Sequence, residues 1–242
     1  MNISKQAKQE TAEKVPVPDA SLVDWFMIEF WPRFGKQTTY LLLGIAVVVS
    51  VGVWYNNDRL ASQAKENKLL GQAYLLYSED KTDAAETFLN SFLKTGHSRL
   101  VQDKANLMLG QILYSKAKYD QAIKVFSLVD LSDTKHSLVA SGALHGVAAS
   151  YIQIKDYGKA VESLEKFVSL FGRRTGAPSE KVEGKEVTDL SPAVPNALWK
   201  LTLSYRELKN DPKAKSSAEK LVKIYPESKE AFDATRLLAQ MP

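Results

Sequence analysis

The side chains that most often carry out catalysis or bind metals are few in this sequence, and their spacing does not suit either task. The three histidines, His97, His136 and His145, form no His-x-x-x-His or Glu-x-x-His pair that would bring two ligands to one helical face. The absence of cysteine excludes thiolate catalysis, Cys-ligated zinc and disulfides. No Gly-x-Ser-x-Gly elbow, Walker loop or Rossmann fingerprint is present either. We therefore expect no enzyme activity, no metal and no cofactor.

The charge of the chain argues against a nucleic-acid partner. The formal net charge is +4, and residues 1–57 carry five basic and five acidic side chains while the rest carry 27 and 23. A nucleic-acid binder usually gathers its basic groups on one face, whereas this excess is thin and spread out. The hydrophobic content of 45% is that of an ordinary globular protein. We expect other proteins as partners, and neither nucleic acid nor a small-molecule substrate.

Residues 37–57 predict a transmembrane helix. These 21 residues carry no formal charge, and the hydrocarbon core of a bilayer needs about 20 residues of helix. Tyr40, Trp54 and Tyr55 stand near the ends, where aromatic rings favour the headgroup level. A buried core helix of this length is rarely apolar on all faces, and a secretory signal begins closer to the N-terminus and ends in small residues. We therefore expect an uncleaved anchor that contacts the lipid bilayer.

Two kinds of sequence precede this span. Residues 1–24 contain prolines and many charges and are predicted to be a disordered tail. Residues 25–36 are predicted to form an interfacial amphipathic segment, with a docking helix for a membrane partner as the alternative. Their aromatic residues are Trp25, Phe26, Phe30, Trp31 and Phe34. Basic residues flank the span on both sides, so the positive-inside rule does not decide its orientation. The short tail and large C-terminal part favour a C-terminal domain delivered across the membrane.

Residues 58–242 repeat a pattern of small residues that is typical of tetratricopeptide repeat (TPR) hairpins. Four alanines, 37, 38 and 54 residues apart, fall in the expected second helices: Ala85, Ala122, Ala160 and Ala214. Twelve residues before them stand Ala73, Gly110, Ala148 and Thr202. Small residues at both places let the two helices of a hairpin approach closely. The sequence thus predicts an all-α fold: a single N-terminal transmembrane helix followed by a TPR-like α-solenoid of about four helix hairpins. An irregular helical bundle is the alternative.

The last interval between the alanines is too long by about half a repeat. Residues 172–192 explain the excess, because they combine glycines and prolines with alternating charges. We predict that this segment is a solvated loop inserted between two hairpins.

In a TPR array the first helix of each hairpin lines the concave face. In this sequence, the residues at the corresponding positions of the four predicted first helices are mostly apolar and aromatic. The predicted groove residues are Leu70, Tyr74, Tyr77, Lys104, Gln111, Tyr114, His145, Asn196, Trp199 and Arg206. Only Lys104 and Arg206 are cations, so the carboxylate clamp of chaperone-binding TPR proteins is not evident. A hydrophobic helix or an unfolded segment fits this surface better, with Tyr and Trp side chains as anchors.

The layout of the chain resembles a known family. The resemblance is carried by the stretch Trp31-Pro-Arg-Phe-Gly-Lys36, an anchor ending in Val51-Gly-Val-Trp-Tyr-Asn56, and a divergent TPR domain. Together they look like the bacterial inner-membrane TPR proteins that are ancillary subunits of the Sec translocon. The resemblance implies a single-pass inner-membrane protein with a cytoplasmic tail and a periplasmic C-terminal domain. Residues 172–192 and the longer N-terminal tail depart from the family pattern.

Three functional classes remain after this comparison. The resemblance implies a scaffold that assists Sec-dependent translocation or transfer to a periplasmic chaperone, with the Sec translocon, a prolyl-isomerase-like periplasmic chaperone or unfolded clients as partners. The second class is a TPR adaptor for another envelope complex, such as outer-membrane assembly or envelope biogenesis. The third is an enzyme regulator or sensor whose N-terminal tail signals on the opposite side of the membrane.

Overall fold

The computed structural model of the chain describes residues 24, 28, 31–132, 137–174, 181–182, 185–186 and 188–241. These residues fall into two compact units, Met1–Ala61 and Ser62–Pro242. The predicted disordered tail lies outside the described residues except for Asp24, and so do Trp25, Phe26 and Phe30 of the predicted interfacial segment.

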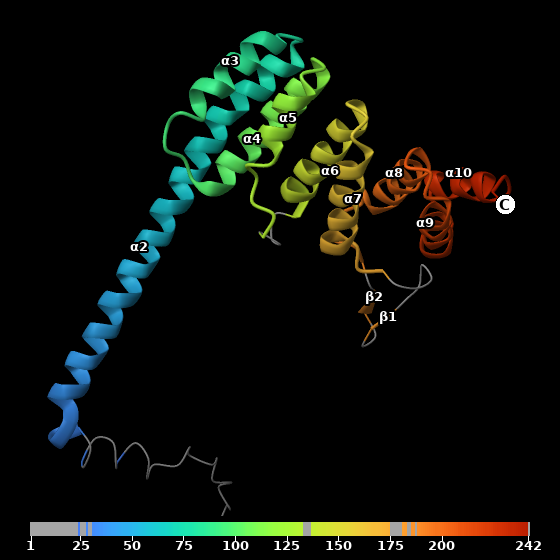
Figure 1. Cartoon of the computed structure of the whole chain (residues 1–242). Coiled ribbons are helices and arrows are strands. Elements are labelled where there is room, and N and C mark those ends of the chain that lie inside the picture. Colours follow the sequence, from blue (N-terminus) through green and yellow to red (C-terminus); the bar gives the residue numbers. More distant parts are fainter. Residues whose placement is uncertain are drawn as a thin grey trace, which may run out of the picture. The chain divides into compact units, whose positions relative to one another are not determined.

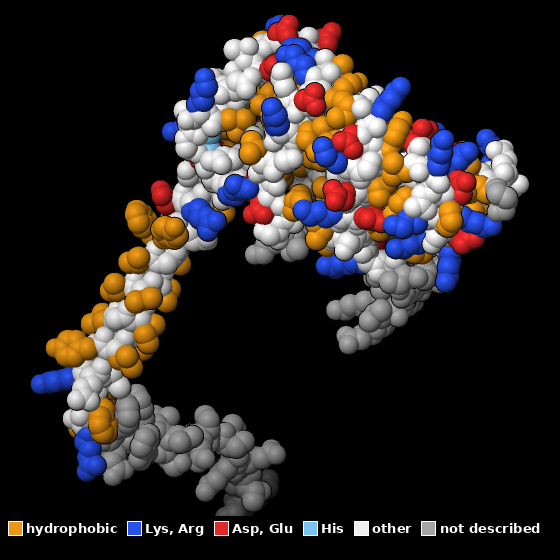
Figure 2. Space-filling model, in the orientation of Figure 1, with side chains coloured by type: hydrophobic (Ala, Val, Ile, Leu, Met, Phe, Trp, Pro, Cys, Tyr) orange, Lys and Arg blue, Asp and Glu red, His pale blue; other side chains and the backbone are white. Residues whose placement is uncertain are grey.

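A long helix contains the predicted membrane span. Helix α2, Trp31–Ser78, is one continuous α-helix of 48 residues, so residues 31–36 of the predicted interfacial segment belong to the same helix as the span. Its apolar window is long enough and apolar enough to cross a membrane, and none of that window is buried. Figure 2 shows apolar side chains along this helix. A helix in the core of this chain would instead hide its apolar side chains from solvent.

Helical hairpins make up the second unit, with one more helix after them (Figure 1). The C-terminal part of α2 pairs with α3 (Thr82–Phe92), α4 (Arg99–Ser115) with α5 (Tyr119–Phe126), α6 (Ser137–Gln153) with α7 (Tyr157–Phe171), and α8 (Val194–Glu207) with α9 (Asp211–Ile224). Helix α10, Lys229–Leu238, follows. We call the first helix of each hairpin its A helix and the second its B helix. The predicted all-α solenoid of about four hairpins is confirmed, whereas α10 was not predicted.

Small residues hold the helices of each hairpin close together. The four repeat alanines of the B helices are all 0% exposed. Phe126 shows how tight the packing is, because a Cβ added to Gly110 or Gly146 would lie 2.5 or 2.6 Å from its ring. Neither glycine can be enlarged without moving that ring. The small residues of the repeat pattern are therefore required by helix packing.

Each hairpin turns through one residue in the left-handed conformation. These residues are Asp80, Ala117, Lys155 and Lys209, with φ between 53° and 62°, and each lies five positions before a repeat alanine. The N–H of the next residue donates to the carbonyl five positions earlier, as from Lys118 to Leu113 at 2.9 Å. This is the hydrogen bond of a Schellman motif, which ends a helix in a single turn. Because each turn lies at the same distance before its repeat alanine, the B helix of every hairpin begins at the same point of the repeat.

Two hydrophobic clusters form the core, and α6 belongs to both. The N-terminal cluster contains residues of α2, α3, α4 and α5, together with Ala143 and Val147 of α6. The C-terminal cluster contains residues of α7, α8, α9 and α10, together with Leu144 and Ala148 of α6. Because apolar side chains cover several faces of α6, the helix connects the first two hairpins to the last two.

The segment predicted to be an inserted loop contains two short strands, and hydrogen bonds connect its two ends. Strands β1 (Lys181–Val182) and β2 (Lys185–Glu186) pair antiparallel. Asp189 Oδ1 accepts hydrogen bonds from the backbone N–H groups of Arg173 (2.7 Å) and Arg174 (3.0 Å). The Leu190 N–H donates to the Phe171 carbonyl at 2.8 Å. These bonds join the two ends of the insertion beside the end of α7.

Candidate protein-binding surface

Five of the residues predicted to contact a partner are accessible on the A helices. Tyr74 and Tyr77 of α2 are 51% and 42% exposed, and Gln111 of α4 and Arg206 of α8 are also exposed. Trp199 of α8 is half-buried because it packs against the C-terminal cluster. A tyrosine or tryptophan that is partly exposed can bury a large area against a partner at a small cost in side-chain entropy.

Leu70 corrects the prediction of the groove. This side chain is 1% exposed and belongs to the same cluster as Ala85 and Leu89 of α3. The pattern of the repeat places core and surface positions side by side on one A helix, and Leu70 lies on the core side. No partner can reach it in the folded domain.

Polar side chains join each A helix to the next helix in the same series. The contacts are Lys104 Nζ to Asn67 Oδ1 (3.0 Å), Gln153 Nε2 to Tyr114 Oη (3.3 Å), His145 Nε2 to Asn196 Oδ1 (3.0 Å) and Asn196 Nδ2 to Glu230 Oε1 (3.2 Å). They connect α2 with α4, α4 with α6, α6 with α8, and α8 with α10. The remaining predicted residues, Lys104, Tyr114, His145 and Asn196, therefore lie on one side of the repeat domain. We call this side, with the five accessible residues above, the A-helix surface.

His145 is the most strongly perturbed titratable group on this surface. Its pKa is lowered to about 4, mainly by burial and also by the neighbouring Lys200 ammonium, while the Asn196 hydrogen bond opposes the shift. Lys200 Nζ lies 3.2 Å from His145 Nε2, and burial lowers the pKa of Lys200 as well. A lysine ammonium can only donate and the Asn196 side-chain oxygen can only accept, so Nε2 bonds to one of these two partners at a time, according to the tautomer. At neutral pH the His145 imidazole is therefore uncharged.

The structure adds four residues to this surface that the sequence did not indicate: Asn67, Gln153, Lys200 and Glu230. Lys200 lies four positions after Asn196, so the helical period alone places both on one face of α8. Glu230 lies on α10, a helix that the repeat pattern did not predict. Within the described residues, no group of three or more His, Cys, Asp or Glu side chains is arranged to hold a metal ion.

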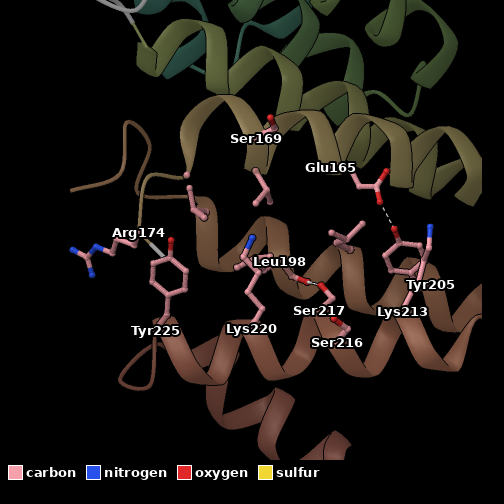
Figure 3. Close-up of a pocket in the computed structure, with 14 residues that line it drawn as sticks. Glu165, Ser169, Arg174, Leu198, Tyr205, Lys213, Ser216, Ser217, Lys220 and Tyr225 are labelled. Carbon is pink, nitrogen blue, oxygen red and sulfur yellow. Dashed lines mark hydrogen bonds between the residues drawn. The ribbon is translucent and has the colours of Figure 1, made fainter. Parts of the chain in front are cut away.

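A cleft of about 520 Å³ lies between α7 and α9, with α8 as its floor (Figure 3). We call it the α7–α9 cleft. The lining residues are Glu165, Val168, Ser169, Gly172, Arg174, Val194, Leu198, Leu201, Tyr205, Lys213, Ser216, Ser217, Lys220 and Tyr225. The repeat pattern predicts a binding surface on the A helices, so this cleft between two B helices was not predicted from the sequence.

Comparisons with known proteins agree with this architecture. Models of the family described as tetratricopeptide repeat match residues 103–135, 142–172 and 196–228. These ranges correspond to the second, third and fourth hairpins. The first hairpin lies outside the matched residues. No curated protein matches the chain in a sequence search.

Solved structures of TPR proteins resemble the chain at low sequence identity. A tetratricopeptide repeat protein from Parabacteroides merdae has a TM-score of 0.55 and 17% identity, covering 73% of this chain and 59% of that chain. MamA from Desulfovibrio magneticus, from residue 41 to its end, has a TM-score of 0.52 and 18% identity, covering 74% and 85%. YrrB, described as a TPR protein with an unusual peptide-binding site, has a TM-score of 0.51 and 14% identity, covering 81% and 88%.

Identity at this level shows the fold, and the matched family models show the repeats within it. The last three hairpins, with their left-handed turns and buried alanines, are the structural counterpart of those matches. Residues 103–135, 142–172 and 196–228 are tetratricopeptide repeats by these matches, and the fold that contains them resembles that of solved TPR proteins.

Proposed function

We propose that this protein is a membrane-anchored scaffold that binds polypeptide segments of other proteins on its A-helix surface. The observation that carries the proposal is the pairing of two features in one chain: an exposed apolar stretch within α2 and a TPR array with accessible aromatic side chains. TPR arrays are generally interaction modules, because stacked hairpins create an extended surface for a partner.

The anchor is supported by the surface of α2. From Tyr40 to Tyr55 its large apolar side chains are more than half exposed, and the helix carries no charged residue between Lys36 and Asp58. Such a stretch is costly in water and stable in a bilayer. Aromatic residues near both ends suit the two interfaces.

Binding of polypeptide is supported by the composition of the A-helix surface. Tyr74, Tyr77 and Trp199 provide aromatic anchors, and Gln111 and Arg206 provide polar groups that a peptide backbone or carboxylate can meet. Lys104 is already hydrogen-bonded to Asn67, which leaves Arg206 as the accessible cation among the predicted residues. An apolar or unfolded segment is therefore the preferred ligand class.

We further propose a place for this scaffold at the bacterial inner membrane, with the repeat domain in the periplasm and the Sec translocon or a periplasmic chaperone as its partner. This part rests on the resemblance of residues 31–56 and on the order of anchor and repeats. Reporter enzymes fused to each end of the chain test the orientation, since periplasmic activity is expected only from the C-terminal fusion. Crosslinking in intact membranes then separates a translocon subunit from an adaptor of another envelope complex.

The A-helix surface is tested by changing Trp199→Ala together with Tyr74→Ala. Loss of two aromatic anchors should weaken partner binding by about tenfold or more, while helical content and melting temperature stay nearly unchanged because neither side chain is fully buried. Thr87→Ala with Glu219→Ala, two exposed positions on B helices, is the matched control. Unchanged partner recovery from membranes with the double aromatic variant would show that another surface binds.

A further inference from the structure

We propose that the α7–α9 cleft is a second binding site, which accepts an acidic peptide segment whose apolar side chains enter between the two helices. This proposal does not depend on the function of the A-helix surface. It rests on three observations: the position of the cleft on α8, its apolar floor, and the cations along its rim.

The cleft and the A-helix surface lie on opposite faces of α8. Leu198, Leu201 and Tyr205 line the cleft and recur at spacings of three and four residues, so they share one face of the helix. Asn196 and Trp199 of the A-helix surface point away from that face by the same helical geometry. A partner in the cleft and a partner on the A-helix surface can therefore bind the same molecule at once.

The floor of the cleft is apolar and the volume suits a few side chains. Val194, Leu198 and Leu201 come from α8, and Val168 from α7 forms part of a wall. A volume of about 520 Å³ lies within the range of about 300 to 1,000 Å³ that is usual for ligand sites. A leucine or phenylalanine of a partner would remove its own apolar surface from water here, whereas Val194, Leu198 and Leu201 are at most 6% exposed and contribute little additional burial.

The rim of the cleft carries an excess of positive charge. Lys213, Lys220 and Arg174 line it, and Glu165 is the one carboxylate among its described lining residues. Glu165 already accepts a hydrogen bond from the Tyr205 hydroxyl. Within the described part of the chain, neither Lys213 nor Lys220 lies within ion-pair distance of a carboxylate.

Two of these cations are held in place by aromatic rings. Lys213 Nζ lies 5.3 Å from the centre of the Tyr205 ring, and the Arg174 guanidinium lies 5.8 Å from the centre of the Tyr225 ring. Cation–π contacts of this length position a cation without neutralising its charge. The buried Nε of Arg174 has no hydrogen-bond partner, although Asp189 Oδ2 is 3.7 Å away. Asp189 therefore partly neutralises Arg174, and Lys213 and Lys220 are the rim cations without an ion-pair partner among the described residues.

The spacing of the cations favours a peptide over a small amphiphile. Lys213 lies at the Tyr205 end of the cleft and Arg174 at the Tyr225 end, with Lys220 between them (Figure 3). A fatty acid has one carboxylate and would meet one of these cations. A segment with several Asp or Glu residues around an apolar side chain can meet all three, and charge-assisted bonds at separate points fix its register.

The test uses the full chain in nanodiscs of uncharged phosphatidylcholine and a short fluorescent peptide in which Leu and Phe alternate with Asp and Glu. Fluorescence anisotropy measures its binding. Lys213→Glu with Lys220→Glu should weaken binding by about tenfold or more. Lys223→Glu with Lys229→Glu changes the net charge equally outside the cleft and should alter binding by less than about twofold. Ser216→Trp, which places a ring at the mouth of the cleft, should also weaken binding.

Several results would overturn the proposal. Equal weakening by the two lysine pairs would mean that the peptide senses only net charge. Loss of binding in the Trp199→Ala and Tyr74→Ala variant, with the cleft variants unaffected, would assign the peptide to the A-helix surface. Binding that appears only after residues 175–187 are deleted would assign the cleft to the chain's own insertion. Circular dichroism of each variant shows that a loss does not come from unfolding.

Discussion

Phe126 lies against two glycines from neighbouring A helices, and this contact makes the packing of the repeats testable. The Cβ of an alanine at position 110 would lie 2.5 Å from the Phe126 ring. Gly110→Ala should therefore lower the free energy of unfolding by about 1 to 3 kcal/mol, even though alanine favours helix. The midpoint of urea unfolding, followed by circular dichroism, measures the change.

Gly71 provides the matched control for this substitution. It lies in the same kind of A helix, is exposed, and has nothing within 4 Å of the added Cβ. Gly71→Ala should raise stability by up to about 1 kcal/mol, because only the helix propensity changes. If both substitutions raise the free energy of unfolding, Phe126 does not pack closely against Gly110 of α4.

The buried His145 predicts a loss of stability in mild acid. Its pKa is lowered from 6.5 to about 4 in the folded chain, first by burial and then by Lys200. Between these two pH values the unfolded chain binds a proton that the folded chain does not, so acidification favours unfolding. The contribution of neutral His145 to the free energy of unfolding is fully present above pH 6.5 and is lost progressively toward pH 4. It amounts to roughly 3 kcal/mol.

The variant His145→Gln isolates this effect from the titration of carboxylates. It keeps a polar side chain beside Asn196 but cannot be protonated in this range. Stability measured from pH 7 to pH 4 should fall more steeply for the natural chain than for the variant. Parallel curves would show that His145 titrates normally in the folded protein.

At the scale of the helical elements, the hairpin turns carry a strain that a glycine would relieve. Ala117 has φ of 56°, a conformation that costs a residue with a Cβ about 1 to 2 kcal/mol. Ala117→Gly should therefore raise the free energy of unfolding by up to about 1 kcal/mol, after the greater entropy of glycine in the unfolded chain is subtracted. Differential scanning calorimetry detects the change as a higher melting temperature.

A second alanine, five positions later, gives the opposite result. Ala122 is 0% exposed inside α5 at the crossing with α4. Ala122→Gly removes a packed methyl group and weakens the helix, so it should lower stability by about 1 kcal/mol or more. Equal effects from the two substitutions would mean that the turn at Ala117 is not the left-handed one.

The elements differ in how far the sequence could predict them. The repeat hairpins were predictable because close helix crossing demands small residues at fixed places, as at Gly110 and Ala122. Helix α10 has no such signature. The ordered ends of the insertion depend on Asp189, which bonds backbone groups at residues 173 and 174 that are far away in sequence. Long-range bonds of this kind leave no local pattern.

The two binding surfaces were predictable to different degrees, because one follows from the period of a helix and the other from contacts between elements. The helical period puts Tyr74, Tyr77 and Trp199 on A helices, and the structure finds them accessible. It places Leu70 in the core, because surface and core positions adjoin on one helix. The α7–α9 cleft arises where two B helices separate above α8, and this spacing between elements cannot be derived from one repeat alone.

At the scale of the whole molecule, the chain combines an apolar helix that suits a bilayer with a repeat domain that presents aromatic side chains. The most direct test is site-specific photocrosslinking of the full chain in intact membranes. A photoreactive residue at Tyr74 or Trp199 should crosslink to a partner polypeptide, whereas one at Thr87 or Glu219, exposed on B helices, should not. Crosslinks only at the B-helix positions, or none at any of the four in a membrane-integrated chain, would contradict a polypeptide-binding A-helix surface.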